Sequence, residues 1–341
     1  MTVFDAGHAL LVGVGADLPN TVDDAVGLAN VLRDPERCAY PPAQVHLLTG
    51  EQATRAAILA ALEQLADAGP ESTVVVYFSG HGYQVATAIG EAYYLMLYGY
   101  DVRRLYQTAV SGAEFAARLQ ALDVQKLLVL LDCCHAGGVS EGKSPDLALT
   151  KAPLPPEAQT LLAAGRGRVV IASSQADELS YAGRPYSAFT LALIEALCGV
   201  GVARRDGFVR VGDLALHARE VVPSRTGGRQ HPILHFEQAD NFALAYYAGG
   251  ASDPKGLPFI TPPEIEPAPG AWRTRIMSQS AVGDSNVQVQ MDGVSGSPVS
   301  INVEPRPERA APRACPACGE TPPPGARFCA RCGAQLGEGY G

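Results

Sequence analysis

No run of apolar residues in the 341-residue sequence approaches the length needed to span a bilayer, so no transmembrane segment is expected. The sequence also lacks an excess of basic residues, because 26 Lys and Arg against 35 Asp and Glu give a formal net charge of −9. A protein-wide electrostatic attraction to nucleic acid or to an anionic membrane is therefore not expected. No basic region precedes the first apolar stretch, which we interpret as a core strand and not as a signal peptide.

The eight cysteines lack the layout of a secreted disulfide framework. Cys38 and Cys198 stand alone, Cys133 and Cys134 are adjacent, and the other four form two CxxC pairs near the C-terminus. This distribution favours a reducing cytoplasm, where thiols stay available for catalysis and for metal binding.

Hydrophobic residues make up 47% of the sequence, enough for one sizeable α/β domain with appendages. Residues 1–248 alternate apolar runs with helix-like stretches, which predicts a mainly parallel sheet with helices on both faces. The expected strands are 8–14, 45–49, 74–79, 126–132, 168–173 and 232–236. The expected helices are 23–34, 54–67, 112–122 and 188–199, where apolar residues recur at three- and four-residue steps.

Proline and glycine mark the expected boundaries. Residues 138–167 are predicted to form a long surface loop or an interdomain linker, and residues 249–279 a flexible linker. Residues 280–305 hold two alternating β-prone runs, NVQVQM and PVSINV, around a Gly/Ser-rich turn. They form either a solvated hairpin or a homotypic motif that pairs edge to edge. Residues 306–314 are a second linker, ahead of a small module at 315–336.

Two reactive side chains follow buried strands of the predicted sheet. YFSGHGYQ places His81 after the 74–79 strand, and LLVLLDCCHAGG places Cys134 after the 126–132 strand. Ligands of open parallel sheets bind at the carboxyl ends of the strands, so both side chains reach the same edge. Alone, His81 is a hydrogen-bonded loop histidine and Cys134 a small buried side chain, but the pair predicts thiolate chemistry with an imidazole that transfers protons. A phosphatase loop of the C-x5-R type is excluded by Ser140.

These motifs resemble those of the peptidase C14 superfamily, on its metacaspase-like and bacterial caspase-like branch. His81 precedes Cys134 by close to the roughly 50 positions usual in caspases. D-C-C-H-A-G replaces the QAC-type signature and is nearer the metacaspase form D-x-C-H-[SA]-G. The resemblance covers roughly residues 6–247 and implies a caspase–haemoglobinase α/β fold with a six-stranded sheet.

The resemblance also implies roles for the residues of the two motifs. Cys134 is the expected nucleophile because it directly precedes His135, a residue expected to be structural, and Cys133 is its non-catalytic neighbour. His81 is expected to protonate the leaving amine. The backbone N–H groups of Gly82 and Cys134 are the expected oxyanion donors.

Metacaspase-like enzymes carry an acidic S1 pocket that selects arginine or lysine, whereas true caspases select aspartate. The matching positions are Asp24 and Asp132, and Ser79 and Thr21 are expected to line the same pocket. Paired carboxylates suit the several donors of a guanidinium group. Alternatively, Asp24 is a stabilising charge near a helix N-terminus.

Two further expectations follow from the resemblance. Lys143 and Lys151, in the 138–167 segment, are candidate autoprocessing sites if cleavage follows basic residues, the alternative being an ordinary solvated loop. No calcium requirement is predicted, because residues 95–115 retain Asp101 and Glu114 but no adjacent acidic pair.

The C-terminal module is CPACGETPPPGARFCARCGAQL, with two CxxC knuckles each followed by glycine. Four thiolates complete a closed tetrahedral zinc site, so the metal is expected to be structural. The module resembles the small zinc ribbons appended to many bacterial proteins, and two disulfides are the alternative. The expected ligands are Cys315, Cys318, Cys329 and Cys332.

The sequence thus predicts a cytoplasmic cysteine endopeptidase that cleaves proteins after basic residues, in bacterial stress or defence signalling. The alternative is a regulated signalling scaffold or peptide-binding module with a C-terminal interaction motif. An inactive homologue is disfavoured by the intact His81 and Cys134. The expected partners are protein and peptide substrates and a homotypic or heterotypic protein bound through residues 280–341, with no membrane and no nucleic acid.

Overall fold

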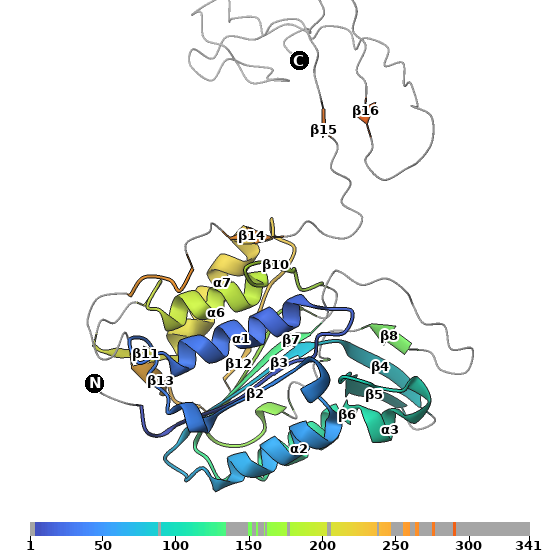
Figure 1. Ribbon diagram of the computed structural model, residues 1–341, viewed down its shortest axis with the longest axis horizontal. Coiled ribbons are helices and arrows are strands. Elements are labelled where there is room, and N and C mark those ends of the chain that lie inside the picture. The colour runs from blue at the N-terminus through green and yellow to red at the C-terminus, as the bar shows by residue number, and fades with distance from the viewer. Residues whose placement is uncertain are drawn as a thin grey trace, which may run out of the picture. The chain divides into compact units, whose positions relative to one another are not determined.

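A six-stranded sheet with the order β12-β9-β7-β3-β1-β2 forms the centre of the fold (Figure 1). The edge strand β12 runs antiparallel to β9, and the other neighbours pair in parallel. The strands are β1 (Gly7–Gly13), β2 (Val45–Thr49), β3 (Thr73–Gly80), β7 (Lys126–Cys133), β9 (Arg168–Ala172) and β12 (Ile233–His235). Each lies within a residue or two of its predicted position, and the predicted α/β architecture with a mainly parallel six-stranded sheet is confirmed.

This computed structural model divides the chain into two compact units, residues 1–271 and 272–341. The residues that it describes are 4–87, 90–133, 149–151, 155, 160, 162–175, 178–202, 206–236, 239–246, 255–259, 263–265, 275–276 and 289–290.

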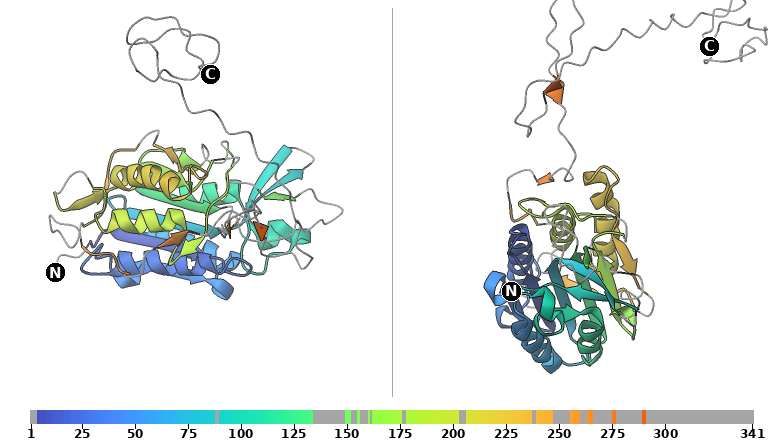
Figure 2. Two further views of the ribbon diagram at one scale, coloured as in Figure 1. Left: turned by 90° about the horizontal axis from the view of Figure 1, so that it is seen from above. Right: turned by 90° about the vertical axis from the view of Figure 1, so that its right-hand side faces the viewer.

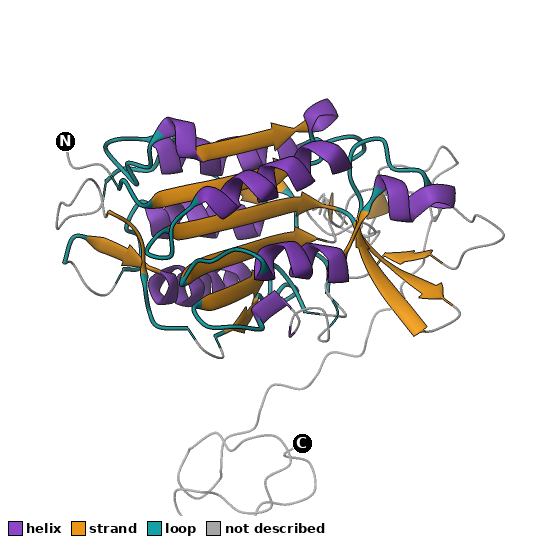
Figure 3. Cartoon of the chain, turned by 90° about the horizontal axis from the view of Figure 1, so that it is seen from below, coloured by secondary structure: helices purple, strands orange, loops and turns teal. Residues whose placement is uncertain are grey.

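Helices cover both faces of the central sheet (Figures 1 and 3). One face carries α1 (Asn20–Arg33), α6 (Ala188–Leu197) and α7 (Val211–Arg225), and the other carries α2 (Arg55–Gln64) and α4 (Gly112–Gln120). Alternate residues of β1 point to the two faces, so that Leu11 packs with the first group and Leu10 with the second. The near-continuous hydrophobicity of the strands therefore has a direct structural cause.

The helix starts follow ordinary capping chemistry. The side chains of Thr54, Ser111 and Ser187 accept hydrogen bonds from backbone N–H groups in the first turns of α2, α4 and α6. Helix α7 was not expected, and Pro223 lies in its last turn. The short helices are α3 (Leu105–Thr108), η1 (Pro42–Gln44), η2 (Gly50–Gln52), η3 (Leu65–Asp67) and η4 (Val102–Arg104).

A smaller antiparallel sheet, β6-β5-β4-β8, begins directly after His81 and lies at one end of the central sheet (Figure 2). Its strands are β4 (Gly82–Thr87), β5 (Gly90–Leu95), β6 (Val110–Ser111) and β8 (Leu149–Lys151). The sequence did not predict this sheet. Strand β8 falls inside the 138–167 segment expected to be a loop, and its backbone pairs with β4, with Lys151 opposite Tyr83.

Two short strand pairs complete the first unit. Strand β11 (Phe208–Arg210) pairs with β13 (Ala243–Tyr246), and β10 (Gly183–Arg184) pairs with β14 (Glu264–Ile265). We call the described residues 255–259 and 263–265 the strap. The strap also contacts residues that lie just outside α1 and α6. Arg37 Nη2 donates to the carbonyl of Gly256, and the ring of Phe259 packs against that of Tyr186. The first compact unit therefore includes residues beyond 248, the predicted end of the peptidase domain.

In the second unit, β15 (Arg275–Ile276) pairs with β16 (Val289–Gln290). Strand β16 belongs to the NVQVQM run, so its partner here precedes the 280–305 segment. The PVSINV run and the four CxxC cysteines lie outside the described residues. Among the helices of the described ranges, none combines the length and the apolar character that a membrane span requires.

Candidate active site

His81 stands between the last residue of β3 and the first residue of β4. Its side chain is only 5% exposed, and its Nε2 lies 2.8 Å from Oδ2 of Asp17. Tyr83 contacts the same imidazole edge-on, with 5.9 Å between ring centroids. The backbone carbonyl of His81 accepts a hydrogen bond from Met96 N at 2.9 Å. The imidazole is therefore held at the carboxyl end of the central sheet by a carboxylate and by an aromatic ring.

The neighbouring strand β7 brings the cysteine motif to the same edge. In the β3–β7 register, Ser79 is opposite Asp132 and Gly80 is opposite Cys133. Cys133 is buried, and that burial raises the pKa of its thiol to about 12. A thiol of this kind is protonated at neutral pH, which agrees with the interpretation of Cys133 as the non-catalytic neighbour. Cys134, the predicted nucleophile, lies outside the described residues.

Asp24 and Asp132 are both fully buried and meet at Ser187. Asp24 Oδ1 accepts from the backbone N–H of Ser187 at 2.8 Å, and Asp132 Oδ2 accepts from the Ser187 hydroxyl at 2.8 Å. The second carboxylate oxygen of Asp132 accepts from the Ser180 hydroxyl at 2.5 Å. Burial and the negative charge of Asp132 raise the pKa of Asp24 well above its ordinary value.

The serines that hold this acidic pair were missed by the sequence analysis, and so was Gln230 behind them. The Gln230 side-chain amide donates to Ser180 Oγ and to the Ser173 carbonyl, while its oxygen accepts from Tyr181 N. No motif marks these residues, because a serine or glutamine in a loop is common. Only the acidic pair itself was visible in the sequence.

The other predicted pocket residues occupy different surroundings. Ser79 is buried at the end of β3, opposite Asp132 in the sheet register. The Thr21 hydroxyl accepts from Gly15 N and donates to the Leu18 carbonyl, each at 2.8 Å. Thr21 therefore closes the loop between β1 and α1. Its hydroxyl lies among backbone groups of that loop, and its role in a pocket stays a prediction.

The alternative interpretation of Asp24 was a stabilising charge near a helix N-terminus. The acidic residue in the first turn of α1 is Asp23, and the Asp24 carboxylate accepts from the N–H of Ser187, which precedes a different helix. The geometry thus connects Asp24 to Asp132 and α6.

No cluster of three or more His, Cys, Asp or Glu side chains suited to a metal ion occurs among the residues with described positions. Asp101 caps η4 and pairs with Arg104, and Glu114 pairs with Arg55, so the two acids serve separate contacts. The predicted zinc ligands and Lys143 lie outside the described residues.

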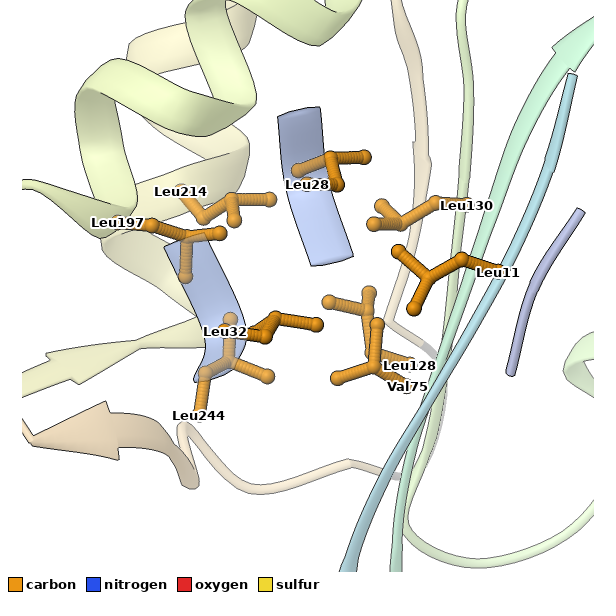
Figure 4. A pocket seen from close by; sticks show the side chains of 9 residues that line it. All are labelled: Leu11, Leu28, Leu32, Val75, Leu128, Leu130, Leu197, Leu214 and Leu244. Carbon is orange, nitrogen blue, oxygen red and sulfur yellow. The ribbon is translucent and has the colours of Figure 1, made fainter. Parts of the chain in front are cut away.

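A small apolar cavity lies inside the core, between the sheet and the helices α1, α6 and α7 (Figure 4). Only leucine and valine side chains surround it, so it offers no group for chemistry or for orienting a ligand. It lies among Leu11, Leu28, Leu32, Val75, Leu128, Leu130, Leu197, Leu214 and Leu244.

A protein-family model described as the caspase domain, peptidase C14, matches residues 6–243. The chain belongs to the caspase family. The match spans both β3, which ends beside His81, and β7, which leads to Cys134. Membership supports a caspase-like cysteine peptidase and suggests that its substrates are proteins.

Solved structures of low identity also resemble the chain. A crystal structure of a Geobacter sulfurreducens protein is 20% identical, with a TM-score of 0.46, and the match covers 67% of this chain and 92% of that one. Caspase-1 from Spodoptera frugiperda is 16% identical, with a TM-score of 0.41 and coverage of 69% and 88%. No curated protein matches the chain.

Proposed function

We propose that this caspase-family protein is an endopeptidase that cleaves after arginine or lysine through His81 and Cys134. The proposal is supported by the position of His81 at the carboxyl end of β3 and by the adjacent end of β7, the strand that leads to Cys134. The observation that carries the basic preference is the buried acidic pair, Asp24 and Asp132, joined through Ser187.

The acidic pair suits a cationic side chain for an electrostatic reason. Two carboxylates in a buried site repel each other, and this repulsion contributes to the raised pKa of Asp24. A guanidinium or ammonium group placed between them would relieve the repulsion and supply hydrogen-bond donors. An aspartate side chain would place further negative charge beside this pair, so cleavage after aspartate is disfavoured.

In the proposed reaction, the Cys134 thiolate attacks the scissile carbonyl, and the backbone N–H groups of Gly82 and Cys134 stabilise the oxyanion. Collapse of the tetrahedral intermediate breaks the C–N bond, and His81 gives its proton to the leaving amine. Water then attacks the thioester and loses its proton to His81, which releases the carboxylic acid product and regenerates the thiolate.

The decisive experiment compares fluorogenic peptides ending in arginine, lysine or aspartate. We expect cleavage after arginine and lysine by the wild type and none by Cys134→Ala, while Cys133→Ala, the matched control, remains active. Cleavage after aspartate would overturn the basic preference and keep the dyad. Full activity of Cys134→Ala would overturn the dyad.

Lys151 lies in β8, opposite Tyr83 and therefore close in register to Gly82 and His81. This position supports autoprocessing at Lys151, and Lys143, the other candidate site, lies outside the described residues. If the proposal is correct, the wild type yields two fragments that a Lys143→Ala, Lys151→Ala variant does not. The same two fragments from that variant would refute it.

The second candidate function is a regulated scaffold, favoured by the division of the chain at residue 271. On this hypothesis the C-terminal unit binds a protein partner, with zinc held by Cys315, Cys318, Cys329 and Cys332, whereas a role in bacterial stress or defence signalling is proposed for the endopeptidase. Elemental analysis should give one zinc per chain in the wild type and a clear loss in Cys318→Ser. Equal zinc content in both proteins would exclude this ligand set.

A further inference from the structure

We propose that Asp17 is a positioning residue for the imidazole of His81, which fixes the tautomer of the ring and stabilises its protonated form. This inference rests on the proposed cysteine-peptidase function. Its observation is the 2.8 Å contact between Asp17 Oδ2 and His81 Nε2, across 64 positions of sequence. The motifs of the sequence do not include Asp17.

The loop that carries Asp17 is anchored to the end of the strand that carries His81. Val14 N donates to the Ser79 carbonyl at 3.0 Å, so the chain leaving β1 is tied to β3 two residues before His81. Leu18 N donates to the Gly15 carbonyl at 3.0 Å and closes a tight turn around Asp17. The Thr21 hydroxyl bridges the same turn through Gly15 N and the Leu18 carbonyl.

The turn has a backbone shape that must be maintained by these contacts. Gly15 has φ +69°, and the next residue, Ala16, has φ +58°. A left-handed conformation costs a residue with a Cβ roughly 1 kcal/mol, so Ala16 adopts it only under constraint. The strained residue directly precedes Asp17, so these contacts hold the backbone from which the Asp17 carboxylate extends.

The contact determines how His81 uses its two nitrogens. A carboxylate accepts a hydrogen bond, so Nε2 carries a proton and donates it to Asp17. Proton exchange with the substrate and with the nucleophile is thereby assigned to Nδ1. The buried imidazole has lost water, which disfavours its charged form, and the negative carboxylate opposes that effect.

Several groups near Asp17 and His81 determine how strongly the carboxylate stabilises the protonated imidazole. The Asp17 side chain is 55% exposed, which screens its charge. Tyr100 lies near Asp17, and burial together with the Asp17 charge raises the pKa of its phenol, which keeps it neutral. The Tyr83 ring is neutral and packs against His81, and Cys134 is the proposed partner on the β7 side.

The test compares Asp17→Asn, which keeps a hydrogen-bond acceptor but loses the charge, with Asp17→Ala, which loses both. Asp23→Asn is the matched control, since it removes an exposed acid in the first turn of α1. We expect kcat of Asp17→Ala to fall by roughly tenfold with KM unchanged, a fraction of a full general acid–base contribution. In Asp17→Asn, the alkaline limb of the kcat/KM profile should move to lower pH, because the imidazolium loses its anionic partner.

A second readout does not depend on turnover. In an NMR titration of histidine-labelled protein, with His81 assigned by His81→Gln, the His81 pKa should be lower in Asp17→Asn than in the wild type and in Asp23→Asn. An unchanged His81 pKa would overturn the inference, even if the wild type cleaves no peptide and the proposed peptidase function fails. If Asp17→Ala loses thermal stability, its activity no longer tests the inference. The result for Asp17→Asn, which nearly keeps the side-chain volume, is then the one that tests it. A kcat/KM profile for Asp17→Asn that coincides with that of the wild type would also overturn it.

Discussion

The carboxyl group of Asp24 is buried completely, and its environment makes ionisation costly. Burial and the charge of Asp132 raise its pKa above that of an unfolded chain. Between the two values, the unfolded state has lost a proton that the folded state keeps, so stability is present below the unfolded pKa of about 3.9 and declines as pH rises above it. Asp24, one of the residues proposed to bind substrate, thus reduces stability at neutral pH.

Asp24→Asn should separate stability from specificity. We expect the unfolding temperature at pH 7 to rise by a few degrees. A neutral amide avoids the cost of ionising a buried carboxyl group beside Asp132. Cleavage after arginine should fall by at least about tenfold, because one carboxylate partner of the guanidinium is lost. Calorimetry at pH 5 and pH 7 measures the unfolding temperature, and peptide kinetics measures the cleavage rate after arginine. A variant less stable than the wild type at pH 7 would contradict this account.

At the residue scale, His81 and Asp132 could be singled out because they stand at the ends of apolar strands, whereas Asp24 was assigned by the resemblance to metacaspase-like enzymes. The sequence could not predict Asp17, because nothing local distinguishes that aspartate from others that follow strands. Its significance depends on the Gly15–Leu18 turn and on the β1–β3 pairing, which are set by tertiary contacts.

At the scale of elements, α6 and α7 are joined by a buried ionic cluster. Glu195 Oε2 lies 3.0 Å from His217 Nε2, and Oε1 accepts from Arg225 Nη2 at 2.5 Å. Burial opposes ionisation of Glu195, but the hydrogen bonds from His217 and Arg225 outweigh it and lower its pKa. The stabilisation is therefore present above the unfolded pKa of about 4.3 and is lost as pH falls through the folded pKa.

Glu195→Gln should cost about 2 kcal/mol of unfolding free energy at pH 7, because two charge-assisted hydrogen bonds are weakened. The difference in unfolding free energy between Glu195→Gln and the wild type should become smaller as the pH approaches 4. Urea unfolding at several pH values measures this. A difference that stays constant between pH 7 and pH 4 would contradict the assignment.

Helix α1 contains Gly27 for a packing reason. A Cβ at this position would lie 2.3 Å from Cε1 of Tyr186, whose ring also contacts Phe259 of the strap. In an open helix, Gly→Ala stabilises by about 1 kcal/mol. Here overpacking reverses the sign, so Gly27→Ala should lose roughly 1–2 kcal/mol.

The double variant Gly27→Ala, Tyr186→Leu provides the control, since the smaller side chain leaves room for the methyl group. In urea unfolding, Gly27→Ala should be less damaging in the Tyr186→Leu background than in the wild type. A gain of stability in Gly27→Ala alone would show that the ring moves freely.

Some helices and strands could be predicted from the sequence and others could not. Long apolar runs such as that of β7 are buried on both faces and could be assigned directly. Strands β4 and β5 were missed because they begin with Gly82 and Gly90, and because their side chains are partly exposed, so they lack the continuous apolar run of a buried central strand. Helix α7 was missed because Pro223 and its many polar residues weaken the periodic pattern.

At the scale of the whole molecule, residues 1–271 should fold without the rest of the chain, since contacts divide the protein there. A chain that ends at residue 271 should unfold within a few degrees of the full-length protein and keep peptidase activity. A chain that ends at residue 248 removes the strap and should unfold at a lower temperature. Equal melting temperatures for the two shortened chains would contradict a structural role for the strap.

The β10–β14 pair has a mechanical consequence. Strand β14 is the last described element of the first unit, and its partner β10 ends three residues before Ser187, the residue that joins Asp24 to Asp132. Tension applied to the chain beyond residue 265 is borne first by this pair of two-residue strands, which has few hydrogen bonds with which to resist. A pull that separates β14 from β10 frees the segment leading to Ser187, so the acidic pair is the part of the proposed site most directly exposed to force.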